Sequence, residues 1–589
     1  MLPYISVPFE FASRVTGASV DELKLIFSFL LSYPLAGLLK RIPDDKPYLK
    51  NVFNIGVSIF VLIGLFDLWS GLFVLLFSAA GTYAICSLVS GPYMPWIGFI
   101  FHMGFMSVSH IYRQIVSDPG LVDITGAQMV LVMKLTAFCW NVYDGTQPAE
   151  HLDDYQKSRA LKKLPNILDY IGYVFFFPSL MAGPAFDFAD YRKYLETSMF
   201  DLPPGTDPAK APPTRGKRRI PRSGTPAAYK AATGLAWIVA FLEFSKYYHT
   251  DVVLDESYRS YGFLRRVWLL HMLGFTTRMK YYGVWSLTEG SCILSGIGYK
   301  GIDPATGKAD WSRLTNVKPW GVELAQNSHA YLGNWNINTN NWLRNYVYLR
   351  VTPRGKKPGF RASMATFVTS AFWHGFYPGY YLTFILGSFL QNTSKNSRRL
   401  LRPFFMTADG KKPLPRKRYY DLLSYLLTQV SFSFCVAPFI LLEIGDSLVV
   451  WARVYFYAVV GVLACSAFLL SPGKAYLSQQ VKKHTASGPS VAGQTVVDKL
   501  PKFLPEGMVG REPGQARPGL SRESSQRLPT YLGLPNDPGE EWDEMVDEIA
   551  GEIEKRRKEG KDPVQEIKSV LRERFGDKFV KEKERRKEL

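Results

Sequence analysis

The chain has 589 residues, a net charge of +19, and a composition that is 47% hydrophobic and 14% aromatic. A soluble protein of this length would consist of about four domains, but the apolar residues come in long blocks, which excludes a set of soluble domains and predicts a membrane protein. The positive charge would also suit a nucleic-acid-binding protein, but its position in loops favours a membrane protein that follows the positive-inside rule.

Apolar blocks are the first predicted elements along the chain. Several approach the roughly 20 residues that cross a bilayer as a helix. Others are shorter or contain a charge and would be shielded inside a bundle. We therefore expect an all-α, polytopic bundle of roughly 8–12 transmembrane or re-entrant helices. The clearest blocks are residues 23–39, 52–68, 71–89, 95–108, 171–181, 231–244, 422–442 and 449–470.

Three segments rich in lysine and arginine lie between the later apolar blocks. Residues 203–222 contain six basic residues and one acidic residue, residues 346–361 contain five and none, and residues 395–418 contain nine and one. The positive-inside rule places all three on the cytosolic side of the membrane. Two apolar blocks follow the last of them, so we expect the C-terminal segment to return to the cytosol.

The C-terminal segment differs in composition from the rest of the chain. Residues 478–538 are rich in Gly, Pro, Ser and Gln, which predicts flexibility, and residues 540–589 are highly charged, which predicts one or two solvated helices. We therefore predict two parts. Residues 1–474 would form a membrane-embedded core, and residues 475–589 would form a charged, partly disordered cytosolic tail.

A single histidine lies in an apolar stretch long enough to enter the membrane. Residues 362–394 contain no Asp, Glu, Lys or Arg, and His374 lies within them in the sequence WHGFYPGYY. Gly375, Pro378 and Gly379 interrupt a helix there, and broken backbone at membrane depth must be buried or line a cavity. The stretch either turns back or crosses once with one flanking charge assignment wrong. An ionisable residue inside a membrane is costly, so His374 is either functional or a hydrogen-bonded core residue.

An asparagine-rich segment precedes this histidine. In GNWNINTNNWLRNYVY, residues 333–348, Trp335 and Trp342 are seven residues apart and share a helix face. Four asparagines recur beside them, and asparagine is a poor choice inside a helix unless its amide is used. The segment is therefore either functional or a polar interfacial helix with a tryptophan anchor.

A third segment, RMKYYGVWSLTEG, contains a carboxylate next to an apolar run. Trp285 and Glu289 are four residues apart and would face the same way on a helix. Glu289 is a functional candidate because of its depth. A structural salt bridge from Glu289 to Arg278 or Lys280 is the alternative.

Together these segments resemble the membrane-bound O-acyltransferase (MBOAT) superfamily. WHGFYPGYY is similar to its histidine motif, and NWNINTNNWLRNYVY is similar to its asparagine motif. Three segments resemble the lysophospholipid acyltransferase branch: DITGAQMVLVMKLTAFCWNVYDG, SLMAGPAFDFADYRKYLE and KYYGVWSLTEG. The resemblance covers about residues 23–472 and not the tail. The histidine motif alone indicates the superfamily, and the five segments in order indicate the branch.

The resemblance implies transfer of a fatty acyl chain from acyl-CoA to the free hydroxyl, expected at sn-2, of a lysophospholipid. The reaction would serve phospholipid synthesis or remodelling, inside a tunnel of a multi-pass protein of the endoplasmic reticulum membrane. A glycerol hydroxyl is a weak nucleophile, and the neutral imidazole of His374 is suited to act as its general base. The amide of Asn336 would polarise the thioester carbonyl as charge builds on its oxygen.

Further site residues are expected around these two. Glu289 would orient His374 or hold the acceptor head group. Aromatic residues would shape the pocket: Trp285, Trp335, Trp373, Tyr380 and Tyr381. Basic residues in or beside a predicted cytosolic loop would bind the CoA phosphates: Arg344, Arg350, Arg354, Lys356, Lys357 and Arg361. No HxE, HExxH or CxxC pattern occurs, so we expect no metal and no cofactor, with acyl-CoA as a co-substrate and no nucleic acid among the partners.

Other functions stay open from the sequence. A sterol or diacylglycerol acyltransferase would have a Phe-Tyr pair leading into Asp and Trp, which GNWN at residues 333–336 lacks. A protein acyltransferase acting on a secreted ligand is another option. A transporter with His374 and Glu289 as a proton relay would be supported by inverted repeats, and none is visible in the sequence.

Overall fold

Helices account for nearly all of the regular structure. The computed structural model describes residues 5–116, 122–202, 211–214, 216, 218–303, 306–352, 360–408, 410 and 412–486. Within these ranges the strands β1 (Gly301–Ile302) and β2 (Ala309–Asp310) form one short antiparallel pair. The all-α class is therefore confirmed. Most of the predicted tail lies outside the described residues, and helix α21 (Pro472–Ala486) continues across the expected boundary at residue 474, so the division into two parts stays a prediction.

The helices follow one another through mostly short connections. The first group is α1 (Val7–Thr16), α2 (Val20–Leu39), α3 (Pro47–Ile59) with the π-helical turn η1 (Phe60–Leu65), α4 (Trp69–Leu88), α5 (Met94–Val116), α6 (Thr125–Gly145), α7 (Asp154–Arg159), α8 (Ile167–Val174) and α9 (Phe188–Leu195). The middle group is α10 (Gly224–Phe244), α11 (Thr250–Leu254), α12 (Phe263–Ser295), α13 (Pro319–Glu323), α14 (Ser328–Gly333) and α15 (Ile337–Leu343) with the π-helical turn η8 (Arg344–Tyr348). The last group is α16 (Phe360–His374), α17 (Pro378–Leu401), α18 (Lys417–Leu441), α19 (Ile444–Arg453), α20 (Tyr457–Leu470) and α21.

Several of these helices are long and apolar enough to cross a membrane. Within the described residues there are five: α2, α3 with η1, α4, α10 and α18. The pair α19 and α20, bent by 78°, would add a sixth. The roughly eight to twelve helices expected at membrane depth also included re-entrant, shorter and charge-bearing helices, which this count leaves out. Helices α6 and α12 are of the charge-bearing kind and bury their charges inside the bundle, since Lys134 and Arg278 are each only 3% exposed.

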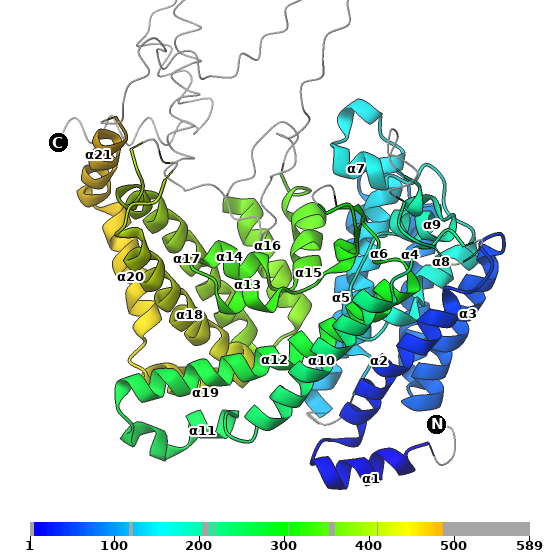
Figure 1. Cartoon of the computed structure of the whole chain (residues 1–589), viewed down its shortest axis with the longest axis horizontal. Coiled ribbons are helices and arrows are strands. Elements are labelled where there is room, and N and C mark those ends of the chain that lie inside the picture. Colours follow the sequence, from blue (N-terminus) through cyan, green and yellow to red (C-terminus); the bar gives the residue numbers. More distant parts are fainter. Residues whose placement is uncertain are drawn as a thin grey trace, which may run out of the picture.

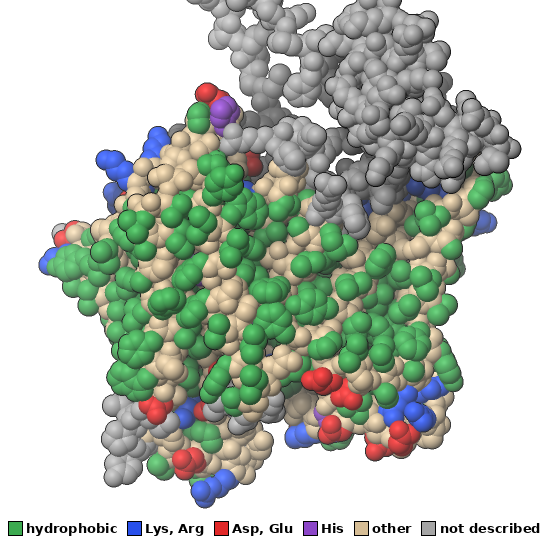
Figure 2. All heavy atoms as spheres, turned by 180° about the vertical axis from the view of Figure 1, so that it is seen from behind, with side chains coloured by type: hydrophobic (Ala, Val, Ile, Leu, Met, Phe, Trp, Pro, Cys, Tyr) green, Lys and Arg blue, Asp and Glu red, His purple; other side chains and the backbone are tan. Residues whose placement is uncertain are grey.

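The surface agrees with a membrane-embedded body. Figure 2 shows hydrophobic side chains covering the middle of one face, with charged side chains gathered towards the two ends. Large apolar residues are exposed on several of the helices, among them Phe73 and Phe77 of α4, Leu422 and Leu427 of α18, and Leu463 of α20. Such side chains are stable on a surface that faces lipid.

The apolar stretch around His374 turns back within the bundle. The helices α16 and α17 pack against each other and are joined by three residues, with Gly375 at φ +123°. At the start of α17, the Gly379 N–H donates to the Leu442 carbonyl at 2.8 Å, next to α19. Beyond the other end of α17, His484 of α21 contacts the carbonyl of Met406 at 3.0 Å. Thus α16 begins on the side of the molecule where α17 ends and α21 lies (Figure 1).

Candidate active site

A cavity of about 160 Å³ inside the bundle brings the histidine and asparagine segments together. Both His374 and Asn336 line it. The sequence separates these two residues by almost forty positions, and helices α12, α17 and α18 complete the walls. Apolar and aromatic side chains form most of the lining, so the cavity shields its few polar groups from water.

His374 is the last residue of α16, where the helix stops because Gly375 takes a positive φ. Its imidazole is enclosed by aromatic rings, with centroid distances of 4.7 Å to Trp373, 5.2 Å to Phe384 and 4.9 Å to Phe439. Among the described residues, no group hydrogen-bonds the imidazole of His374. The ring is therefore held by packing, and its nitrogen atoms are left to interact with a molecule in the cavity.

Asn336 occupies an uncommon backbone position. It is the N-cap of α15 at φ 43° and ψ 53°, a left-handed conformation that asparagine tolerates better than most residues. The amides of its neighbours serve the structure: Asn338 Nδ2 donates to Asn316 Oδ1 at 3.1 Å, and Asn340 Nδ2 donates to the Trp335 carbonyl at 2.8 Å. In the described part of the chain the Asn336 amide has no such partner, and it is the amide available to a molecule in the cavity.

The predicted aromatic residues divide into three groups. Trp285 and Trp335 line the cavity, with ring centroids 5.0 Å apart. Trp373 is buried behind His374, where its indole Nε1–H donates to the Met129 carbonyl at 3.0 Å. Tyr380 lies 5.6 Å from the His374 ring without lining the cavity, and Tyr381 is not among the cavity-lining residues.

Glu289 lies outside this cavity. It is 2% exposed and pairs with Lys230 of α10, with Oε2 at 2.8 Å from Nζ, while its Oε1 accepts from the Thr315 hydroxyl at 2.7 Å. The expected structural partners were wrong, because Arg278 pairs with Glu323 and Lys280 pairs with Glu22. Helix α12 presents Trp285 and Glu289 towards different neighbours, and no described contact joins Glu289 to His374.

Arg278 is a cavity residue that the sequence indicated only as an ion-pair partner of Glu289. Its guanidinium donates to both carboxylate oxygens of Glu323, at 2.7 and 2.8 Å, and Tyr282 donates to the same carboxylate at 2.6 Å. Its Nη1 is buried without a partner among the described residues. Arg278 is the cation of the cavity lining. The sequence signal for it was an arginine at membrane depth, four residues before Tyr282, because a charge at this depth is a candidate for a functional site.

A second cavity of about 320 Å³ lies on the other face of α15. Its lining is polar and includes Asn338, Asn341 and Arg344. Cations and carboxylates from other elements complete it: Lys134, Arg159, Asp187, Asp190 and Arg313. Burial acts to lower the pKa of the Arg159 guanidinium, but Tyr155, Asp187 and Asp190 raise it above its ordinary value, so this group stays charged. Helix α15 thus separates an apolar cavity with His374 from a polar, charged one.

The remaining basic candidates differ in what the structure allows them to do. Arg344 lines the polar cavity, and among the described residues its guanidinium donates only to the side chain of Asn345, at 3.0 Å. Arg350 is committed to Asp144, with two contacts of 2.5 and 2.7 Å, and both side chains are buried. It is therefore a structural cation and not free for a phosphate. Arg361 lies in the first turn of α16, and Arg354, Lys356 and Lys357 lie outside the described residues.

Comparisons with known proteins point in one direction. The family model described as MBOAT, membrane-bound O-acyltransferase family, matches residues 109–437. The chain is 44% identical to a lysophospholipid acyltransferase of Schizosaccharomyces pombe over 82% of its own length and 93% of that protein. It is 38% identical to the lysophospholipid acyltransferase of Saccharomyces cerevisiae over 96% and 93% of the two chains. It is 28% identical to the human membrane-bound glycerophospholipid O-acyltransferase 2 over 67% and 73%.

Proposed function

The chain belongs to the membrane-bound O-acyltransferase family, and on this premise we propose that it is a lysophospholipid acyltransferase that uses acyl-CoA. The observation that carries the proposal is the shared cavity of His374 and Asn336. It brings a potential general base and an amide donor to one apolar chamber. The similarity to two fungal lysophospholipid acyltransferases over most of both chains supports the choice of acceptor.

The proposed reaction uses the two polar groups in different roles. His374 removes the proton from the free glycerol hydroxyl, and the hydroxyl oxygen attacks the thioester carbon. Asn336 donates its amide N–H to the carbonyl oxygen as negative charge develops there. The carbon–sulfur bond breaks, the new ester bond remains, and His374 returns the proton to the CoA thiolate. The apolar walls exclude water, which would otherwise compete with the hydroxyl for the thioester.

The polar cavity beyond α15 supports acyl-CoA as the donor. Arg344 lines it, and arginine is well suited to binding phosphate groups. Arg313 also lines it but pairs with Asp190 at 2.8 Å. We propose that the CoA phosphates bind on this side of α15 while the thioester lies on the other side, next to Asn336. Asp187 and Asp190 leave only part of the cavity suited to anions, which favours the end at Arg344.

We base the proposed membrane orientation on the positions of the basic segments in the chain. Helix α16, which follows the second basic segment, begins on the side where α21 lies, and α17, which leads into the third, ends there (Figure 1). The positive-inside rule supports the proposal that this is the cytosolic side and that the C-terminal tail lies in the cytosol. We propose residence in the endoplasmic reticulum membrane, where cytosolic acyl-CoA and lysophospholipids are both present.

An acceptor panel tests the proposal. Purified full-length protein would be incubated with radiolabelled oleoyl-CoA and, separately, with lysophosphatidylcholine, lysophosphatidylethanolamine, cholesterol, diacylglycerol or a serine-containing peptide. We expect labelled diacyl phospholipid from the lysophospholipids, and no label in the other acceptors. Transfer to cholesterol, diacylglycerol or peptide, with none to the lysophospholipids, would contradict the proposal. The His374→Ala protein is the background control.

A further inference from the structure

A third pocket, of about 230 Å³, lies on a neighbouring face of α12 from the one that lines the His374 cavity. Lys280 and Val284 of α12 line this pocket, whereas their neighbours Tyr281 and Trp285 line the cavity. The other walls come from the N-terminal part of α2 and the C-terminal parts of α5 and α10, which meet on the side of the molecule where α1 lies (Figure 1).

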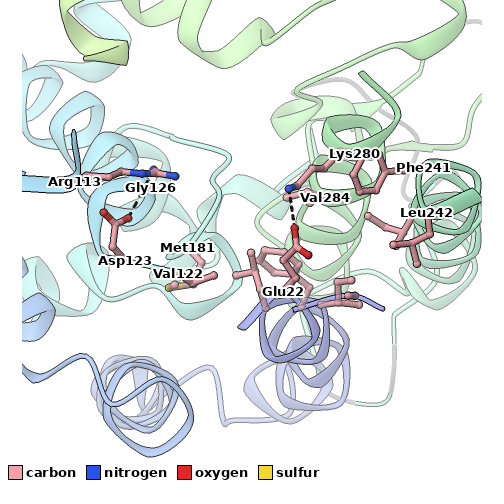
Figure 3. A pocket seen from close by; sticks show the side chains of 15 residues that line it. Glu22, Arg113, Val122, Asp123, Gly126, Met181, Phe241, Leu242, Lys280 and Val284 are labelled. Atoms are coloured by element: carbon pink, nitrogen blue, oxygen red, sulfur yellow. Dashed lines mark hydrogen bonds and ion pairs between the residues drawn. The ribbon is translucent and has the colours of Figure 1, made fainter. Parts of the chain in front are cut away.

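Four charged side chains surround the pocket as two ion pairs. Lys280 Nζ lies 3.0 Å from Glu22, and Arg113 Nη1 lies 3.8 Å from Asp123. Figure 3 shows that Arg113 and Lys280 point towards one another from opposite sides of the pocket. Their side chains are 51% and 47% exposed, so both are accessible to a ligand. The arrangement has no net charge, but it offers two cations and two anions.

The ion pair between Arg113 and Asp123 is long, at 3.8 Å. Asp123 already accepts hydrogen bonds from the backbone N–H and hydroxyl of Thr125, at 3.1 and 2.6 Å, at the start of α6. Its distance to Arg113 exceeds that of a hydrogen bond. The guanidinium of Arg113 is therefore able to turn to a stronger acceptor, such as a phosphate, without leaving Asp123 unsatisfied.

The rest of the pocket is apolar. Leu25, Ile26 and Phe29 of α2 form one wall, and Ile238 and Leu242 of α10 form another. The apolar wall matches a hydrocarbon chain, and the four charged side chains match a head group that carries both a phosphate and an amine. An amphiphile with one hydrocarbon chain and such a head group has both parts. A free phosphate or a free amine would leave this wall without a partner.

The pocket also lies close to the reacting groups. Tyr281, next to Lys280 in α12, has its ring in the His374 cavity, 5.6 Å from Trp335. Arg113 lies one helical turn beyond His110 in α5, and His110 contacts the carbonyl of Trp373, next to His374, at 3.1 Å. A turn of helix rises about 5.4 Å, so a phosphate at Arg113 is within a short reach of the cavity.

We infer that this pocket selects the acceptor by its head group: a zwitterionic lysophospholipid binds with its phosphate between Arg113 and Lys280 and its amine against Glu22 and Asp123. Its hydrocarbon chain lies along the wall of α2 and α10, and its glycerol hydroxyl faces the His374 cavity past Tyr281. The inference rests on the proposed function and adds the class of head group to it.

Direct binding tests the phosphate contacts. Binding of radiolabelled lysophosphatidylethanolamine to the full-length protein in detergent would be measured without acyl-CoA, so that no turnover is needed. Arg113→Gln and Lys280→Gln should each weaken binding about tenfold, the effect of losing one charge-assisted hydrogen bond. Arg113→Lys and Lys280→Arg, which keep the charge, should recover most of it.

Matched controls come from exposed ion pairs elsewhere. Lys246 pairs with Glu243 at 2.6 Å, and Arg259 pairs with Glu256 at 3.3 Å. Lys246→Gln and Arg259→Gln should leave lysophosphatidylethanolamine binding unchanged. Unchanged binding in both pocket variants would overturn the inference, as would equal binding of glycerophosphoethanolamine, which lacks the hydrocarbon chain. If the wild-type protein acylates no lysophospholipid, the proposed function is wrong. The binding measurement needs no acylation, so it still shows whether the pocket binds a lysophospholipid.

The amine contact has its own test. Glu22 closes a capping box at the start of α2 by accepting from the Ser19 N–H, and glutamine serves the same motif. Glu22→Gln therefore removes the charge and keeps the cap. It should lower kcat/KM for lysophosphatidylethanolamine relative to lysophosphatidic acid, which has no amine, by about threefold. An unchanged ratio would contradict the amine contact.

Discussion

His110 and Trp373 are joined by a hydrogen bond from the imidazole Nε2–H to the backbone carbonyl oxygen, at 3.1 Å. Trp373 directly precedes His374, and a Cβ atom on Gly375 would lie 3.2 Å from the other nitrogen of His110. The buried imidazole of His110 thus hydrogen-bonds the residue before His374 and lies close to the residue after it, at the point where α16 ends.

Replacing His110 should affect the chemical step more than substrate binding. We expect His110→Phe to lower kcat about tenfold, because the Trp373 carbonyl loses its donor and the His374 backbone is released. The KM for acyl-CoA should stay unchanged. His110→Gln keeps an N–H donor and should restore part of kcat. Steady-state kinetics on both variants check this, and equal losses in the two would indicate a packing role only.

Replacing His374 should abolish transfer. Loss of a general base costs about 10²–10⁴-fold in rate, and no described residue is placed to take over from His374. His151 lies in the short 3₁₀ turn Ala149–His151 and is exposed, so His151→Ala is a matched control. Product formation at saturating acyl-CoA is the measurement. Near-normal activity of a folded His374→Ala protein would reduce the histidine to packing.

Three substitutions at Asn336 separate its amide from its backbone conformation. Its positive φ disfavours alanine but suits glycine. If the amide donates to the thioester oxygen, Asn336→Gly should lose about 10²–10³-fold in kcat although its backbone is unstrained. Asn336→Ala should lose at least as much, and Asn336→Asp should also be inactive because a carboxylate repels the developing charge. High activity of Asn336→Gly would show that only the conformation matters.

Glu289 should affect stability through Lys230. Glu289→Gln leaves the Lys230 ammonium without its anion, and Lys230→Met leaves a buried carboxylate unpaired. We expect each to destabilise the protein by about 1–3 kcal/mol, below the cost of a fully buried pair because Lys230 is partly exposed. Thermal unfolding in detergent checks this, and the double variant Lys230→Met/Glu289→Met should lose less than the sum. A Glu289→Gln protein of normal stability that fails only in lysophospholipid transfer would restore its predicted role at the acceptor.

Arg344 and Arg350 should differ in phenotype although both were predicted to bind CoA. Arg344→Gln should raise the KM for acyl-CoA about tenfold with unchanged stability, since its guanidinium faces the polar cavity. Arg350→Gln should mainly destabilise, by about 3 kcal/mol, since it leaves the buried Asp144 unpaired. KM values and unfolding midpoints, measured on both variants, decide between these assignments. Similar KM effects without loss of stability would show that Arg350 also reaches the phosphates.

Much of the architecture was predictable because it depends on short-range patterns. Apolar blocks of membrane-spanning length predicted the helices, and Gly375 and Pro378 predicted the break beside His374. The four-residue spacing of Trp285 and Glu289 was a weaker guide, since neighbouring faces of α12 contact different helices. Trp285 lines the His374 cavity, whereas Glu289 pairs with Lys230 of α10.

By itself the sequence determined the helical class and the family resemblance, and it predicted His374 and Asn336 as candidates for the chemistry. The helical class follows from the apolar blocks, and the two candidates follow from short motifs that resemble those of the family. Only the tertiary structure decided that the stretch around His374 turns back, that Arg350 is bound to Asp144, and that Arg113 and Lys280 face one pocket. The partner of a buried charge depends on which helices pack together, and that packing is set by contacts between residues far apart in the chain.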